Sequence, residues 1–151
     1  MVTIRYQILQ SLQARLQQYN FSTWTPEDVH VGRVMFDPDV DRLPLLTVVA
    51  GTDTSNRSAY RTNQREMPID VSGIVSLEDG ADVTELCEPI YGEIEKACFN
   101  GGEIQIGENY FTIEFRGGGI VDYPSDPGPA LVTIGVSLAV TYETDIGNPD
   151  Q

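Results

Sequence analysis

The sequence predicts an α+β domain in which an antiparallel or mixed sheet of about six strands carries two helices on one face. Two segments have apolar residues at helical spacing, and the strand-like runs between and after them alternate apolar and polar residues. A third observation is a polar segment at 51–66, which predicts a long hairpin arm because loops of that length are uncommon inside compact domains.

The chain of 151 residues is long enough for a single domain with its own hydrophobic core. We expect this domain to span residues 1–143 and residues 144–151 to form a flexible C-terminal tail. No apolar run approaches the roughly 20 residues that cross a bilayer, and the first residues lack the apolar stretch of a signal peptide. We therefore expect a soluble protein that is made in a cytoplasm.

The first helix is expected over residues 3–19, where apolar side chains recur on one stripe. The stripe comprises Ile4, Ile8, Leu9, Leu12, Leu16 and Tyr19. The opposite face is rich in uncharged amides: Gln7, Gln10, Gln13, Gln17 and Gln18. This face is either solvated or a subunit contact that avoids the burial of charge.

Three strands should follow, at 29–36, 44–50 and 67–77, with the hairpin arm between the second and the third. Asp82 then caps a second helix, and Glu85 completes an acidic capping pattern. Its buried stripe is expected to contain Leu86, Ile90, Ile94 and Ala97. Pro89 either kinks this helix or marks its first turn.

Two cysteines, Cys87 and Cys98, fall on this helix too far apart for a disulfide, so we expect reduced core residues. Strands near 103–107 and 110–116 should be joined by a tight turn, and a Gly/Pro loop is expected over 117–129.

The final strand, 130–143, has the clearest alternation of the whole chain, with apolar residues on one face and small polar residues on the other.

Charge is divided unevenly along the chain. Residues 1–65 carry a net charge of +1, and residues 66–151 carry −15, out of a total of −14. Three arginines, Arg57, Arg61 and Arg65, are spaced by four within the hairpin arm. A basic arm on an acidic body favours head-to-tail association of copies, and the acidic surface argues against independent binding to nucleic acid.

Candidate catalytic and metal sites find little support in the sequence. The only histidine, His30, falls on an expected strand without a nucleophile motif. Asp37, Asp39 and Asp41 imitate the opening of a calcium loop. The continuation fails, because Arg42 and Val48 stand where glycine and glutamate are required, which favours a solvated turn. We expect no cofactor and no metal.

Several segments together resemble the tail terminator proteins of long-tailed bacteriophages. These are the amphipathic first helix, the strand PLLTVVAG (44–51) leading into the polar arm, the strand MPIDVSGIV (67–75), the second helix, and the strand ALVTIGVSLAVTYE (130–143). The resemblance covers about residues 3–143 and rests on element order and pattern.

The resemblance implies a structural virion protein of the tail or neck that is made in the host bacterial cytoplasm and is not an enzyme. Members of this family form a hexameric ring that ends polymerisation of the tail tube and docks to the head connector. The implied partners are further copies of the chain, the tail tube protein and the head–tail connector or neck proteins. DNA would pass through without sequence-specific binding, and no membrane is involved. We expect Arg57, Tyr60, Arg61 and Arg65 in the subunit interface.

Two other interpretations stay open. The first is a different virion protein, such as a neck adaptor or a tail tube subunit, since neck and head-completion proteins share much of this style. A tube subunit would polymerise into long stacks, where a terminator stops at a closed ring. A small ligand-binding domain or enzyme would need a pocket with converging polar groups. The only candidate for such a pocket is the 117–129 loop with Asp122, Tyr123 and Asp126.

Overall fold

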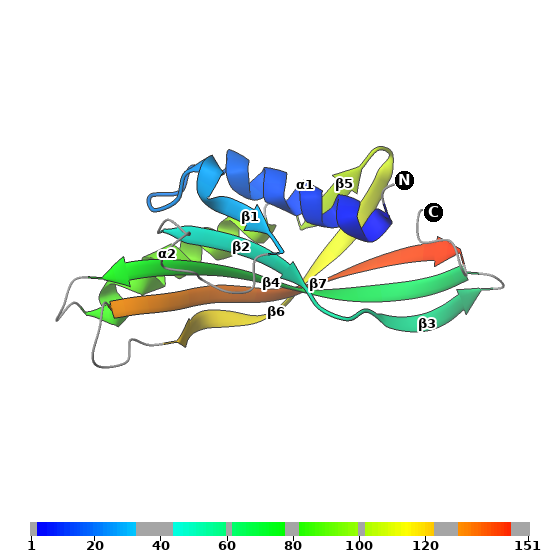
Figure 1. The fold of residues 1–151 in the computed structure, drawn as a ribbon. Helices are drawn as coiled ribbons and strands as arrows, with labels where there is room; N and C mark the ends of the chain where they lie inside the picture. The colour runs from blue at the N-terminus through cyan, green and yellow to red at the C-terminus, as the bar shows by residue number, and fades with distance from the viewer. Residues whose placement is uncertain are drawn as a thin grey trace.

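The computed structural model describes residues 3–32, 44–59, 62–77, 82–99, 102–122 and 130–145. The elements are α1 (Ile4–Gln18), η1 (Pro26–Asp28), β1 (Val29–Val31), β2 (Leu45–Ala50), β3 (Thr54–Ala59), β4 (Thr62–Leu77), α2 (Val83–Phe99), β5 (Glu103–Ile106), β6 (Asn109–Asp122) and β7 (Ala130–Asp145). Figure 1 shows them in one layer of helices and one twisted sheet.

The sheet is mixed, with strand order β1-β2-β4-β7-β6-β5 and with β3 paired to β4. β1 and β2 are parallel, and every other pair is antiparallel. The centre is the pair of 16-residue strands β4 and β7, which pair along their full length from Thr62↔Asp145 to Leu77↔Ala130. Strands of that length extend about 50 Å. The predicted α+β architecture with two helices is confirmed.

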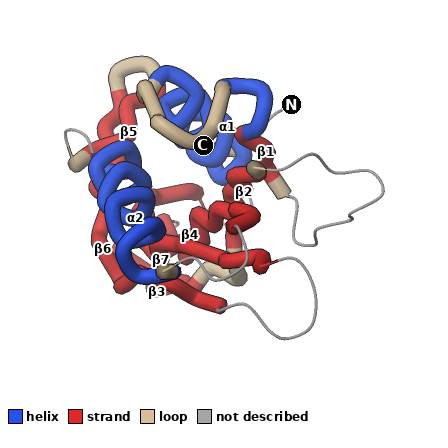
Figure 2. The backbone as a smooth tube through the Cα atoms, turned by 90° about the vertical axis from the view of Figure 1, so that its left-hand side faces the viewer, coloured by secondary structure: helices blue, strands red, loops and turns tan. Residues whose placement is uncertain are grey.

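Both helices pack on one face of this sheet. That face presents alternate residues of the two central strands, such as Val71 and Ile69 of β4 and Leu138 and Ile134 of β7, each at most 1 % exposed. α1 packs against β1 and β5, the two ends of the strand order, so the sheet curls around the helix (Figure 2). A single hydrophobic cluster fills the space between sheet and helices.

The first helix lies within one residue of each expected boundary, and four residues of its expected stripe are buried: Ile8, Leu9, Leu12 and Leu16. Thr3 caps it, because its side chain accepts a bond from the backbone N–H of Tyr6. Part of the amide-rich face is used within the chain: Gln13 donates to the carbonyl of Val29 and Gln17 donates to that of Pro26, each at 3.2 Å. These bonds hold the segment between α1 and β1 against the helix.

The second helix confirms one sequence expectation and corrects another. The carboxylate of Asp82 accepts from the backbone N–H of Glu85 at 3.2 Å, as a cap should. Pro89 lies inside the helix and not in its first turn. Leu86, expected in the buried stripe, is 47 % exposed. Ile94 and Ala97 are buried as expected and Ile90 is partly buried, and Cys87 and Cys98 are buried as well. Both cysteines are free, as expected.

Four strand boundaries differ from the expectation by two residues or more, and the first is that of β1, which ends at Val31 instead of 36. β4 begins at Thr62 instead of 67, and β7 ends at Asp145 instead of 143. β6 continues through the glycines that were expected to open a loop, because Gly117 and Gly119 adopt φ of 128° and 140° around a register shift after Phe115. Glycines have no side chain to alternate, so periodicity could not reveal this part of the strand.

Candidate functional site: the three-stranded arm and its root

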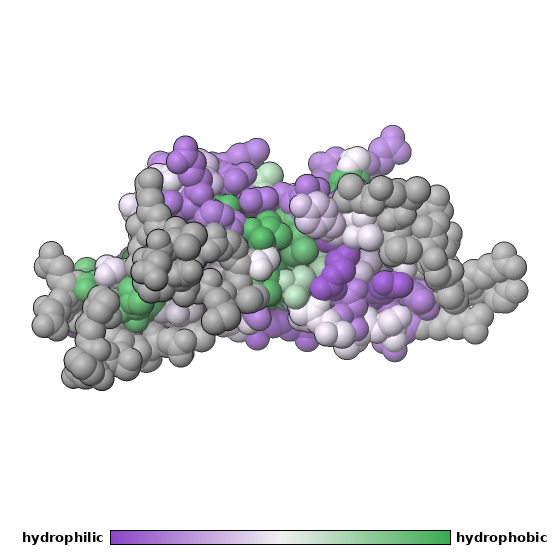
Figure 3. Space-filling view, in the orientation of Figure 1, coloured by the Kyte–Doolittle hydropathy of each residue, from purple (hydrophilic) through white to green (hydrophobic). Residues whose placement is uncertain are grey.

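The most distinctive feature of the molecule is an arm that continues past the helices (Figure 1). It consists of β3, residues 62–66 of β4 and residues 141–145 of β7, and we call it the three-stranded arm. The predicted hairpin at 51–66 is therefore present as β3 and the start of β4, and β7 adds a third strand. The described surface of the arm seen in Figure 3 is mostly hydrophilic.

A charged cluster fastens the root of the arm to α1. Arg5, in the first turn of α1, donates to the carboxylate of Asp53 and to the backbone carbonyl of Gly51. The hydroxyl of Tyr142 donates to the other oxygen of Asp53. The Asp53 side chain is 13 % exposed and that of Arg5 is 33 % exposed. This partly buried carboxylate joins α1, the start of β3 and the end of β7.

The cluster at the root of the arm also changes the pKa of Tyr142. Burial raises the pKa of Tyr142, and the hydrogen bond and charge of Asp53 raise it further. Arg65 acts in the opposite direction, because its positive charge lies beside the Tyr142 hydroxyl. Residues 65 and 142 are partners in the β4–β7 register. The tyrosine therefore remains a hydrogen-bond donor at neutral pH, where it supports Asp53.

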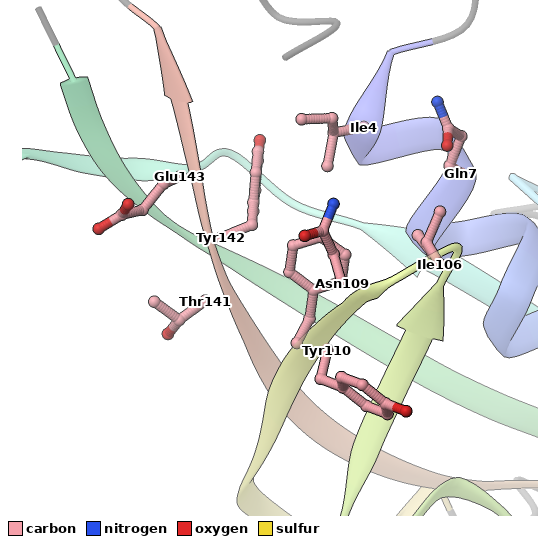
Figure 4. A pocket seen from close by; sticks show the side chains of 9 residues that line it. Ile4, Gln7, Ile106, Asn109, Tyr110, Thr141, Tyr142 and Glu143 are labelled. Atoms are coloured by element: carbon pink, nitrogen blue, oxygen red, sulfur yellow. The ribbon is translucent and has the colours of Figure 1, made fainter.

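Beside the root, β6 and β7 separate and leave a fork. Their ladder begins at Ile113↔Val140. Before that point β6 pairs with β5, and after it β7 continues into the arm with β4. The fork contains a pocket of about 690 Å³. Its walls are the β5–β6 hairpin, the first turns of α1 and residues 141–143 of β7 (Figure 4).

The predicted interface residues are distributed over the hairpin. Arg57 lies in β3 opposite Asn63, and Arg65 lies in β4 opposite Ser55. The three arginines therefore do not follow one strand, because the chain turns back between them. Arg65 is half-buried beside Tyr142. Tyr60 and Arg61, and the side chain of Arg57, lie outside the described residues, and their role in an interface stays a prediction.

The other candidate sites fall largely outside the described residues. Asp37, Asp39 and Asp41 do so, as do Tyr123 and Asp126, and Asp122 is described only as the last residue of β6. His30 is half-buried in β1, opposite Thr47. Within the described ranges, no group of three or more His, Cys, Asp or Glu residues is placed to hold a metal ion.

The face of the sheet away from the helices carries a second set of polar contacts. Arg116, at the register shift of β6, binds Glu66 of β4 at 2.5 Å and Glu114 at 3.1 Å. The Ser137 hydroxyl donates to Asp70 at 2.6 Å. Glu66 and Asp70 lie on β4, which leads into the arm, and Glu114 lies on β6. The described face is therefore acidic, with Arg116 as its cation.

Sequence reasoning missed the root cluster. Arg5, Asp53 and Tyr142 are 48 and 89 positions apart, and none belongs to a motif. The one usable signal was the isolated Asp53 at the start of a polar segment whose other charges are basic until Glu66. No helix in the described part of the chain combines the length and the apolar character that a membrane span needs. No protein-family model matches the chain, and a comparison with curated proteins finds no significant match.

Proposed function

We propose that this chain is a structural virion protein that forms a ring at the head-proximal end of a phage tail tube. In this role it ends tube polymerisation and offers the docking surface for the head connector, and it is not an enzyme. The observation that carries the proposal is the three-stranded arm. Its root joins the hydrophobic cluster at Tyr142, and from there it extends beyond the helices, so intramolecular packing alone gives no reason for its length.

The charge distribution supports an assembly of this kind. The segment 54–65 has three arginines and no acid, whereas residues 66–151 have a net charge of −15. A basic segment at 54–65 and an acidic remainder of the chain attract copies head to tail, which leads to a ring when the rotation closes. An acidic ring would also let DNA pass without holding it. The order of the elements, which resembles that of tail terminators, is a further argument for the proposal.

A neck adaptor or a tail tube subunit is the second candidate. The three-stranded arm would form the subunit contact in those proteins too. The assemblies differ in whether further rings are added. A terminator stops at one closed ring, whereas a tube subunit continues to stack.

Sedimentation velocity at low and high salt, together with negative-stain imaging, tests the proposal. We expect closed rings, six-membered as the resemblance implies, that weaken only partly with salt because exposed ion pairs contribute under about 1 kcal/mol each. Co-expression with the tube protein of the same phage should give tubes of uniform length. Long stacks would favour a tube subunit, and a strict monomer at high concentration, also in the presence of tubes, would contradict the proposal.

Arg57→Glu with Arg61→Glu should block ring formation while the domain stays folded, because both changes place like charge against an acidic neighbour. Arg65 is left unchanged in this variant, because it contacts Tyr142 within the chain. Lys96→Glu on the exposed side of α2 is the matched control for loss of positive charge. Rings of normal stability in the double variant would exclude the arm arginines from the interface.

A further inference from the structure

The three-stranded arm has two free edges. Its strand order is β3-β4-β7, so β3 is one edge. Residues 141–145 of β7 are the other, because the β6–β7 ladder stops at Val140. Among the described residues no strand pairs with either edge. Unpaired edges attract further strands, and proteins usually protect them with lysine, proline or a covering element. The sequence Thr54–Ala59 contains neither lysine nor proline, and its charged residue, Arg57, precedes a register shift, so the regular part of this edge is Thr54–Arg57.

We infer that the β3 edge of one copy of this chain adds to the β7 edge of the next copy, inside the fork. This inference rests on the proposed function and names the contact that would build the ring. The two edges match in length, since β3 has six residues and the free part of β7 has five. Main-chain hydrogen bonds would supply the contact, as in other cases of strand addition.

The contact joins two different edges, so it is heterologous. Each copy can bind one neighbour through its β3 edge and a second neighbour through its β7 edge. Contacts of this type generate rings or open filaments and not closed dimers. β3 and β7 are both antiparallel to β4, so they run in the same direction. In a continuous sheet that repeats from copy to copy, β3 of one copy therefore pairs in parallel with β7 of the next.

The fork has the space and the charge that this contact requires. The pocket of about 690 Å³ lies between residues 141–143 of β7 and the β5–β6 hairpin, so a strand beside β7 would enter it. Glu143 lines the pocket and is exposed, and it forms no ion pair with any described residue. The entering strand carries Arg57 and no acid. Arg57 of the entering strand and Glu143 of the fork therefore carry opposite charges.

Thiol cross-linking tests the contact directly. Asn56 of β3 and Glu143 of β7 are exposed, and Cys87 and Cys98 are fully buried and should not react in the folded protein. The protein with Asn56→Cys and Glu143→Cys, treated with a short bismaleimide, should give a ladder of covalent oligomers that ends at the ring number. Each single variant should stay largely monomeric. Asn56→Cys with Gln18→Cys, which is exposed at the far end of α1, is the matched control.

The outcomes separate this inference from the proposed ring. Rings without a ladder would overturn the edge contact, leave the ring proposal intact and mean that the fork is empty or accepts another partner. A ladder from open filaments would support the edge contact and count against a terminator. Covalent dimers from Asn56→Cys alone would show that β3 pairs with β3, and this result would also overturn the contact between β3 and β7. Failure of both ring and ladder would overturn both.

A charge exchange provides a second readout. In the protein without the added cysteines, Arg57→Glu and Glu143→Arg should each abolish the closed oligomer that sedimentation velocity detects at low salt, and the two changes combined should restore it. Glu88→Arg on the exposed face of α2 should leave it unchanged. A combined variant that stays monomeric although it is folded would contradict the pairing of these two positions.

Discussion

Trp24 packs directly over Gly73, and this contact explains why a glycine stands in the middle of a central strand. A Cβ added at position 73 would lie 2.3 Å from Cζ2 of Trp24, closer than any real contact. Trp24 is 4 % exposed and has little room to move. The glycine therefore admits the ring to the core at some cost in strand propensity.

Gly73→Ala should destabilise the fold by about 1–3 kcal/mol through overpacking. Gly92→Ala is the control, because nothing lies within 4 Å of its added Cβ and alanine favours α2 by about 0.5–1 kcal/mol. Denaturant unfolding followed by the fluorescence of Trp24, the single tryptophan, measures both. Equal stabilities of the two variants would contradict the contact.

Cys98 links stability to alkaline pH. Burial raises its pKa from an ordinary 9.0 to about 12, and the charge of Arg15 opposes the shift. Above pH 9 the unfolded chain loses this proton while the folded chain keeps it, so stability falls as pH rises from about 9 to 12. The slope from this group is at most about 1.4 kcal/mol per pH unit.

Cys98→Ala should therefore lose less stability than the unchanged protein between about pH 8 and pH 10.5. Tyr91 and Tyr142 also have raised pKa values, so the difference between the two proteins is the informative quantity. Denaturant titrations at the two pH values measure it. Parallel pH profiles would contradict the assignment.

At the scale of elements, β7 separates core and surface by alternation. Leu138 is 1 % exposed on the helix side, and Ser137 on the other side bonds to Asp70. Leu138→Ala should cost about 2–5 kcal/mol, because it leaves a cavity in the centre of the core. Ser137→Ala should cost about 0.5 kcal/mol, as for a surface change. If a denaturant titration shows that Ser137→Ala is less stable than Leu138→Ala, the two faces of β7 have been assigned the wrong way round.

The root of the arm depends on Asp53. Asp53→Ala removes the acceptor of Tyr142 and the partner of Arg5, and we expect a loss of about 1–3 kcal/mol from the unpaired buried hydroxyl. Hydrogen exchange at residues 51–59 should accelerate more than exchange in the core. Glu66→Gln is the control, since its pair with Arg116 is about half exposed and should contribute under about 1 kcal/mol. Unchanged exchange in the arm of Asp53→Ala would show that the cluster does not hold it.

At the scale of the whole molecule, the proposed ring should bind DNA weakly or not at all. Seventeen acids and two basic residues follow position 65, and phosphate contacts need lysine and arginine. Anisotropy titrations of assembled rings with duplex DNA at about 150 mM salt measure this. Micromolar affinity with a steep salt dependence that disappears in Arg57→Glu with Arg61→Glu would show that the arm holds DNA instead of a neighbour.

The sequence by itself determined the elements whose side chains alternate or repeat. The stripe of α1, the cap at Asp82 and the faces of β7 were all predicted, because each depends on local spacing and on burial of one face. It also indicated a hairpin arm at 51–66, since that segment has too few apolar residues to join a core.

Only the tertiary structure decided how these elements meet. Leu86 fits the predicted helical stripe but is exposed, because contacts with β6 and β7 set the rotation of α2. The strand through Gly117 and Gly119 has no alternation to read. The cluster of Arg5, Asp53 and Tyr142 and the fork beside it arise where three distant segments come together. Such contacts depend on strand order and curl, which periodicity along the chain does not encode.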